Sequence, residues 1–148
     1  MNICFASEKT RLKKTVLKNT VGFREVFAPL PDNVDILVVS GSCDLSEYLD
    51  RNIDTCIFDS ESTITVSKLK NVNSAISCGM QGLDSVTFSS ISEDSALVCI
   101  RRCIVFGDSV IYPCEFKTRF DYRLGIFQNL VVALVELFVN QKTEKYER

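Results

Sequence analysis

Short apolar runs alternate with amphipathic segments in the first half of the chain. Residues Asn2–Ala6 and 34–40 are apolar runs of strand length, and residues 55–58 form a third. Between the first two runs, residues 8–19 carry leucine and valine at helical spacing behind Ser7, a residue type that favours the N-cap. Strands that alternate with helices usually build a parallel sheet covered by helices. The pattern therefore predicts an α/β fold with a three-layer, mostly parallel, Rossmann-like or P-loop-like sheet.

A glycine-containing turn separates two strand-like runs in the middle of the sequence, residues 73–91. The first run ends near Cys78, and the second, residues 85–91, alternates apolar and polar side chains. Gly79 and Gly82 are expected to permit a positive φ in the turn, because glycine has no Cβ. We interpret the stretch as the hinge between the alternating strands and helices and a β-rich C-terminal part.

The last third of the chain predicts a β-hairpin and a closing helix. Residues 96–106 and 109–118 are strand-like and are separated by Gly107-Asp108, an order that favours a type II′ turn. Pro113 has no amide hydrogen and therefore places the second strand at a sheet edge or a bulge. Residues 124–141 carry apolar side chains over much more than one helical stripe. We expect this helix to be packed on two sides.

Composition supports one folded domain. Of the 148 residues, 46% are hydrophobic and 24% charged, and no repeat or linker divides them, so we expect a single α/β domain over residues 1–148. The net charge of −2 provides no overall positive field, and a nucleic-acid partner is not expected. The longest apolar run, residues 130–139, is too short to cross a bilayer, so a membrane partner is not expected either.

Cysteine and histidine content restricts the candidate chemistry. The seven cysteines are scattered through apolar runs without a C-x-x-C pair, which is typical of buried free thiols in a reducing compartment. We therefore expect a cytoplasmic location, and no signal-peptide pattern starts the sequence. The lack of histidine excludes the usual zinc ligand sets and any nucleophile that a histidine activates. No metal, cofactor or catalytic residue is predicted.

The carboxyl ends of the predicted strands, near residues 7–10, 40–44 and 59–61, are candidates for ligand binding. Lys9 and Thr10 lie at a strand-to-helix junction, where a phosphate-binding loop places the same residue types. Such a loop needs glycines, which are missing here, so an ordinary capped helix start is the alternative. The turn that contains Ser40, Ser42 and Asp44 follows a strand, and ligands of open α/β sheets bind at the carboxyl ends of strands.

A basic cluster follows the first predicted strand. It comprises Lys9, Arg11, Lys13, Lys14 and Lys18. Positive charge near a helix N-terminus opposes the helix dipole unless an anion is bound there. A solvated basic face is the preferred interpretation, with an anion site as the alternative.

Four segments resemble motifs of one enzyme family. NICFASEKTRL at residues 2–12 is similar to a strand followed by a G-T-x-G-K-T/S loop, with Lys9 and Thr10 at the matching positions. TCIFDSE at residues 55–61 is similar to a strand that leads into an Asn-x-Asp-Asp segment. ISCGMQGLDSV at residues 76–86 is similar to I-T-[YF]-G-x-x-x-x-A-D-V. LGIFQNLVVALVEL at residues 124–137 is similar to G-x-H-N-x-x-N-A-L-A-A, with Asn129 in place and Gln128 where the motif has histidine.

In this order, the segments resemble the central domain of the Mur ligases, ATP-dependent enzymes that join amino acids to a carboxylate through an acyl phosphate. The resemblance requires the two strands of residues 73–91 to share a sheet. The loop glycines and the histidine of the motifs are missing, so the resemblance implies a relative without ligase activity.

The first functional hypothesis is a noncatalytic, Mur-ligase-like accessory or interaction module of the bacterial cytosol. Its partner, either another protein or a second copy in a homo-oligomer, would bind the broad apolar surface of the C-terminal helix. The alternative is a protein that binds a nucleotide, another small molecule or a small anion at the carboxyl ends of the strands. The ligand-binding residues would then be Lys9, Thr10, Ser40, Ser42, Asp44 and Asn129. An active ligase or kinase is the third hypothesis.

Overall fold

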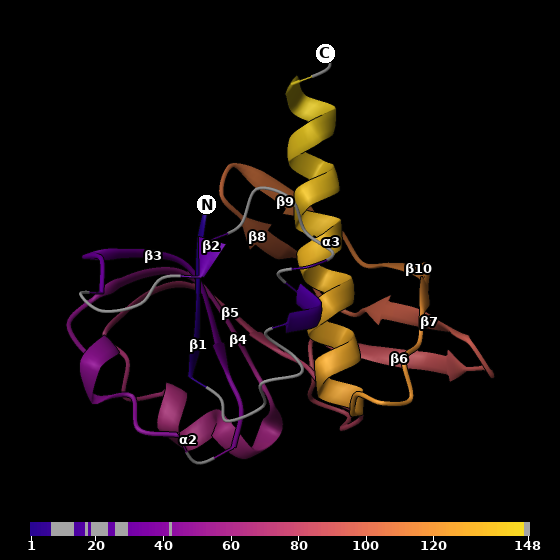
Figure 1. The fold of residues 1–148 in the computed structure, drawn as a ribbon, viewed down its shortest axis with the longest axis horizontal. Coiled ribbons are helices and arrows are strands. Elements are labelled where there is room, and N and C mark those ends of the chain that lie inside the picture. The colour runs from indigo at the N-terminus through magenta and orange to yellow at the C-terminus, as the bar shows by residue number, and fades with distance from the viewer. Residues whose placement is uncertain (7–13, 17, 19–23, 26–29, 42, 147–148) are drawn as a thin grey trace.

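A five-stranded parallel sheet forms the first half of the protein (Figure 1). The computed structural model describes residues 1–6, 14–16, 18, 24–25, 30–41 and 43–146. The strands lie in the order β2-β1-β3-β4-β5, and every neighbouring pair is parallel. Their bounds are β1 Asn2–Ala6, β2 Arg24–Glu25, β3 Asn33–Val39, β4 Asn52–Phe58 and β5 Asn71–Ser77.

The connections between these strands contain short helical turns. Ser46–Tyr48 (η1) joins β3 to β4, and Ser60–Ser62 (η2) with Thr63–Val66 (α2) joins β4 to β5. Side chains from these turns, such as Tyr48 and Val66, pack on one face of the sheet. The turns therefore bury that face without a long crossover helix.

The second half of the protein forms two antiparallel sheets. β6 (Val86–Ile91), β7 (Ser95–Ile100) and β10 (Cys114–Arg119) lie in the order β10-β7-β6, and β8 (Ile104–Phe106) pairs with β9 (Ser109–Ile111). Gly107 between β8 and β9 has φ +57, whereas no described residue other than glycine has a positive φ. Positive φ followed by negative φ is the type II′ pattern, as predicted. Pro113 immediately precedes the edge strand β10, which confirms its predicted place.

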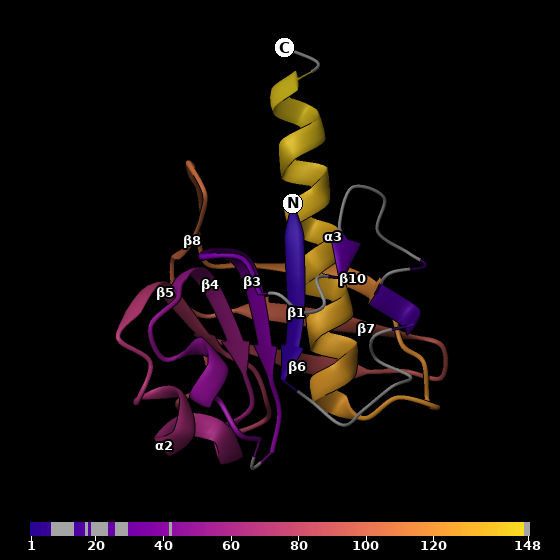
Figure 2. The same ribbon diagram turned by 60° about the vertical axis from the view of Figure 1, so that its left-hand side comes forward.

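The long helix α3 (Ile126–Tyr146) packs against both large sheets (Figures 1 and 2). Its buried side chains include Leu130, Leu134 and Phe138, which share one core with residues of β1, β3 and β7. The rings of Phe106 and Phe138 stack with centroids 4.0 Å apart. Two-sided packing of this helix is thereby confirmed. Its last turns extend beyond the sheets in both views.

The predicted three-layer, Rossmann-like or P-loop-like arrangement is wrong. The strands fall into three separate sheets, and α3 is the one long helix in the described part of the chain. The connection from β6 to β7 is too short for a parallel crossover, so these strands pair antiparallel as a hairpin. Apolar periodicity predicts strands, but it does not specify which sheet a strand joins.

The central stretch, residues 73–91, is a strand, a turn and a strand, as predicted. β5 is an edge strand of the parallel sheet and β6 is an edge strand of an antiparallel sheet. Only the isolated bridge between Cys78 and Val86 connects them as strands. The separation removes the common sheet that the resemblance to Mur ligases requires at this stretch.

Gly79 and Gly82 do not have the predicted positive φ, which occurs instead at Gly41 and Gly107. A Cβ at Gly79 would lie 2.6 Å from Oδ2 of the buried Asp84, whereas a Cβ at Gly82 would have open space. The small size of glycine, and not its backbone freedom, is therefore what position 79 requires.

Candidate functional site

Hydrogen bonds join the chain segments at the carboxyl edge of the parallel sheet, where one of the predicted ligand sites lies. The Gly41 amide donates to Asp59 Oδ2 at 3.2 Å. Ser62 Oγ lies 2.7 Å from Asp59 Oδ1 and 2.8 Å from the Gly41 carbonyl oxygen. The Cys43 thiol donates to the carbonyl oxygen of the buried Ser40 at 2.9 Å. These bonds hold the strand ends together and engage the Gly41 amide, the Asp59 carboxylate and the Ser62 hydroxyl.

Asp44 also has a local structural partner. Its Oδ1 accepts a hydrogen bond from the Ser46 amide at 2.9 Å, which lowers the pKa of the Asp44 carboxyl. This is an Asx-turn that leads into η1. The other predicted ligand residues of this region, Lys9, Thr10 and Ser42, lie outside the described residues. Ligand binding by this set stays a prediction.

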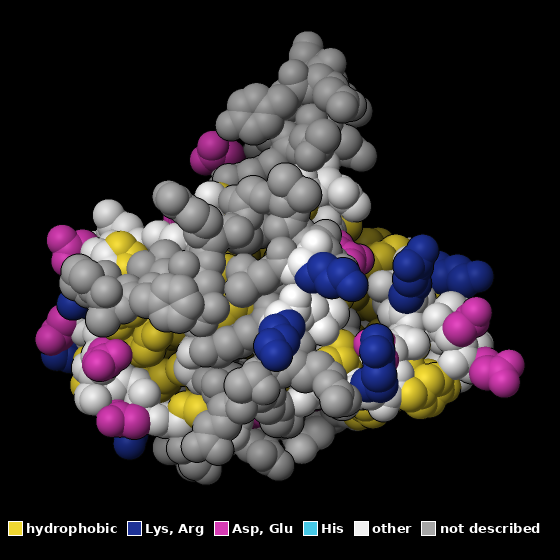
Figure 3. All heavy atoms as spheres, in the orientation of Figure 1, with side chains coloured by type: hydrophobic (Ala, Val, Ile, Leu, Met, Phe, Trp, Pro, Cys, Tyr) yellow, Lys and Arg dark blue, Asp and Glu magenta, His cyan; other side chains and the backbone are white. Residues whose placement is uncertain are grey.

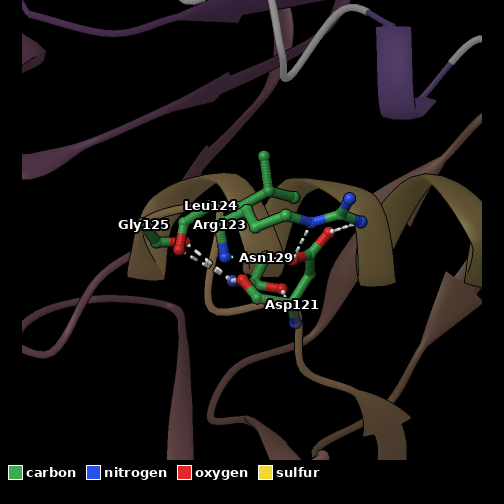
Figure 4. A network of polar contacts seen from close by, with 5 residues as sticks. All are labelled: Asp121, Arg123, Leu124, Gly125 and Asn129. Carbon is green, nitrogen blue, oxygen red and sulfur yellow. Dashed lines mark hydrogen bonds and ion pairs between the residues drawn. The ribbon is translucent and has the colours of Figure 1, made fainter.

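Asn129, the remaining predicted site residue, fixes the loop before α3 (Figure 4). Its Oδ1 accepts from the Asp121 amide at 2.9 Å. Its Nδ2 donates to the carbonyl oxygens of Asp121 at 2.9 Å and Gly125 at 3.0 Å, with that of Leu124 at 3.4 Å. The side chain is only 4% exposed, so these bonds form where water does not compete. Asn129 therefore pins residues 121–125 to the first turn of α3.

This pinned loop forms one wall of a groove of about 990 Å³, which we call the basic groove. The opposite wall is formed by the helical residues Lys14, Thr15 and Lys18, and α3 and the end of β10 complete the groove. A smaller hollow of about 370 Å³ adjoins it and shares the Asp94 and β10 residues. The charged side chains of the basic groove are Lys14, Lys18, Lys117, Arg119, Arg123, Asp94, Asp121 and Glu136. The structure thus brings together cations from two segments about a hundred positions apart.

Cations outnumber carboxylates in the basic groove by five to three. Arg123 is paired with Asp121, with Nη2 2.9 Å from Oδ2. Within the described part of the chain, Lys14, Lys18, Lys117 and Arg119 form no ion pair within 4 Å. Figure 3 shows Lys and Arg side chains gathered on the face where β10 and the lower half of α3 lie. The basic groove is therefore an electropositive surface in a protein whose net charge is negative.

Glu136 lies at the α3 side of the basic groove and is half-buried. Burial raises the pKa of its carboxyl, and the charge of Arg119 opposes this shift. At a pH close to its pKa, a carboxyl with a raised pKa is less ionised than an exposed carboxyl. It therefore cancels less of the positive charge beside it. Glu136 therefore only partly offsets the neighbouring cations when the pH is low.

Two aromatic rings stand beside these cations. The centroids of Phe120 and Tyr122 are 4.8 Å apart in an edge-to-face arrangement, and Phe120 also contacts Phe88 of the core at 5.5 Å. The Tyr122 hydroxyl donates to the Ser92 carbonyl oxygen at 2.6 Å. The rings anchor the loop to the antiparallel sheet, and the exposed ring of Tyr122 adds apolar surface to the groove.

Sequence reasoning missed the basic groove. The sequence pattern favours a solvated basic face for Lys14 and Lys18, and it does not distinguish Lys117, Arg119 and Arg123 from other exposed charges. One sequence pattern indicates an exposed, charged edge strand. Charged side chains occupy every second position after Pro113, at Glu115, Lys117 and Arg119. Only the tertiary structure shows that the two basic segments face one groove.

The fold and the groove define an α/β protein with a basic groove at the edge of an antiparallel sheet. No family model, curated protein or solved structure matches the chain. The comparisons do not test the resemblance to Mur ligases, which stays a prediction, although β5 and β6 do not share the sheet that it requires. In the described residues, no group of three or more cysteine, aspartate or glutamate side chains is placed to share a metal ion, and no helix is long and apolar enough to span a membrane.

Proposed function

We propose that this protein is a noncatalytic accessory or interaction module that binds a negatively charged partner in the basic groove. The observation that carries the proposal is the convergence of Lys14, Lys18, Lys117 and Arg119, none of which forms an ion pair within 4 Å in the described part of the chain. Like charges that gather in a concave surface repel each other, and a bound anion relieves this repulsion. The noncatalytic part of the proposal rests on the sequence, which has no histidine to activate a nucleophile.

Binding at this surface would depend strongly on salt. Exposed ion pairs contribute on the order of 0.2–1 kcal/mol each, so several together give a moderate affinity. The Debye length is about 8 Å at physiological ionic strength, and added salt weakens such contacts. A partner that binds here needs several carboxylates or phosphates in one segment.

A charge-neutralised variant tests the proposal. The double variant Lys14→Gln with Lys18→Gln keeps the side-chain lengths close to those of lysine and removes two cations of the groove. Titration with short poly-L-glutamate at low salt should give a dissociation constant at least fivefold higher than that of the unmodified protein.

The matched control is Lys68→Gln, because Lys68 is exposed and follows α2 on the other face of the parallel sheet. It should bind poly-L-glutamate as the unmodified protein does. Equal affinities for all three proteins, or no binding by any of them, would refute a role for the basic groove.

The second candidate is a nucleotide or another small phosphorylated molecule. The exposed ring of Tyr122 lies beside the cations of the groove, and a base can stack on an aromatic ring while phosphates meet lysine and arginine. A ligand at 100 times its dissociation constant adds about 2.7 kcal/mol of stability. Thermal unfolding with ATP, ADP, UDP-sugars and Mg²⁺ therefore tests this candidate, and the absence of any shift would eliminate it.

The structure explains the broad apolar surface of the C-terminal helix without a partner protein. Most apolar side chains of α3 between Phe127 and Phe138 are buried in the core that the helix shares with the two sheets, so the width of its apolar surface reflects internal packing. Self-association stays a proposal that light scattering can test. A cytosolic location is likewise part of the proposal, and the seven free cysteines support it.

A further inference from the structure

The strand that borders the basic groove has an unpaired edge. β10 ends the three-stranded sheet, and β7 is its one strand neighbour among the described residues. The Phe120 amide donates to the Asp94 carbonyl oxygen at 3.1 Å, which extends the ladder between β10 and β7 by one pair. This bond also fixes which residues of β10 face β7.

Antiparallel pairing alternates between residues that bond to the neighbouring strand and residues that point away from it. Because Phe120 bonds to the β7 side, Thr118 and Phe116 do so too. Glu115, Lys117 and Arg119 therefore direct their backbone N–H and C=O groups to the free edge. In the part of the chain that the structure describes, these groups have no hydrogen-bond partner.

The same residues carry the charges of the edge. The side chains of Lys117 and Arg119 are exposed, and both line the basic groove together with Lys14 and Lys18. Lysine at a sheet edge disfavours pairing with a neutral or basic strand. An acidic strand escapes this penalty, since its carboxylates would lie across from the cations.

We propose that an extended acidic segment of a partner protein adds to β10 as a fourth strand of this sheet. The inference rests on the proposed function, because it assumes that the basic groove binds a negatively charged partner. Backbone hydrogen bonds to residues 117 and 119 would provide the register, and Lys117 and Arg119 would select for acid side chains opposite them, whereas Glu115 on the same face disfavours an acid side chain opposite itself. Pro113, directly before β10, limits the length of the added strand.

The geometry predicts which backbone amides of the partner take part. Residues directly opposite each other in adjacent strands have side chains on the same face of the sheet. A glutamate opposite Lys117 therefore has its own N–H and C=O directed at the Lys117 backbone. Residues between the glutamates direct these groups away from β10.

Three blocked seven-residue peptides test this arrangement, each with alternating glutamate and valine. One is unmodified, one is N-methylated at its glutamates, and one is N-methylated at its valines. We expect the glutamate-methylated peptide to bind at least tenfold more weakly than the unmodified one, and the valine-methylated peptide to bind within threefold of it. In NMR hydrogen-exchange measurements, the unmodified peptide should slow the exchange of the Lys117 and Arg119 amide hydrogens. The Phe116 and Thr118 amides are already protected by their bonds to β7.

Two protein variants complement the peptides. Lys117→Pro removes an edge N–H without removing a bond to β7, and Lys117→Gln removes the charge but keeps the N–H. We expect the proline variant to lose peptide binding and the glutamine variant to weaken it two- to fivefold. Circular dichroism shows whether each variant is folded, and the methylated peptides decide the matter if the proline variant is not.

The outcomes separate this inference from the proposed function. Equal binding of both methylated peptides, or binding of poly-L-glutamate without binding of the unmodified peptide, would overturn strand addition and leave the basic groove as a charged surface. Failure of every acidic probe would overturn both. Protection of the Lys117 and Arg119 amides in a dimer without peptide would assign the edge to a second copy of this chain and refute an acidic partner.

Discussion

Replacing Asn129 by alanine should destabilise the protein strongly, because this polar side chain in the first turn of α3 is buried and hydrogen-bonded. The amide of Asn129 makes two short hydrogen bonds with the backbone of Asp121 and one with Gly125, all between 2.9 and 3.0 Å. A hydrogen bond contributes about 1 kcal/mol net, and a buried group left without a partner costs about 1–3 kcal/mol. Alanine at position 129 should therefore lower the free energy of unfolding by roughly 2–4 kcal/mol.

Urea denaturation followed by circular dichroism measures this loss, and Asn140→Ala is the matched control. Asn140 lies on the same helix but is exposed, so its replacement should change the free energy of unfolding by less than about 0.5 kcal/mol. The midpoint temperature of thermal unfolding should be about 4–16 °C lower for Asn129→Ala, since a loss of 1 kcal/mol lowers the midpoint by about 2–4 °C for a chain of this size. If the two variants are equally stable, the assigned role of Asn129 is wrong.

Three further predictions concern the core and its titrating groups. Gly79→Ala should destabilise the protein by about 1–3 kcal/mol because the new methyl group would displace Asp84, whereas Gly82→Ala should be neutral or slightly stabilising; similar unfolding midpoints would contradict this. Burial holds the pKa of Glu136 above its ordinary value of 4.5, so the folded state binds more protons than the unfolded state and stability falls as the pH rises through that range. Glu136→Gln should lack this fall, and parallel pH profiles for the two proteins would count against it. Burial also raises the pKa of Cys56 to about 12, so a thiol reagent should modify at most four cysteines before denaturation and seven after it. Complete modification of the native protein would show that the buried thiols are accessible. The buried cysteines are Cys4, Cys56 and Cys78.

Elements determined by nearby residues were predictable from the sequence. The turn at Gly107 and the edge position after Pro113 follow from the backbone limits of glycine and proline, and both are confirmed. The two-sided packing of the closing helix was predictable, because its apolar surface is too wide for packing on one side. The predicted strand 96–106 is interrupted after Ile100, which divides one long hairpin into the β7–β10 pair and the β8–β9 pair.

Features that depend on distant residues were not predictable in this way. The apolar alternation of residues 86–91 suits any sheet, so it could not show that β5 and β6 separate into different sheets. The sequence suggests that Gly79 is needed for its backbone freedom. Its steric partner, Asp84, becomes a neighbour only in the folded turn. The basic groove combines residues 14–18 with residues 117–123, and no local pattern relates these segments.

Asn129 shows how a residue selected for ligand binding contributes to a site through structure instead. Its side-chain oxygen and both amide hydrogens are already bonded to the backbone of residues 121–125, so a ligand has no free hydrogen on this group to accept. The loop that it holds carries Tyr122 and Arg123, which line the basic groove. Loss of the Asn129 amide should therefore weaken acidic-peptide binding and lower stability together. Lys117→Gln, which removes an exposed charge and no internal bond, should weaken binding alone. This contrast distinguishes the residues that build the groove from those that contact its partner.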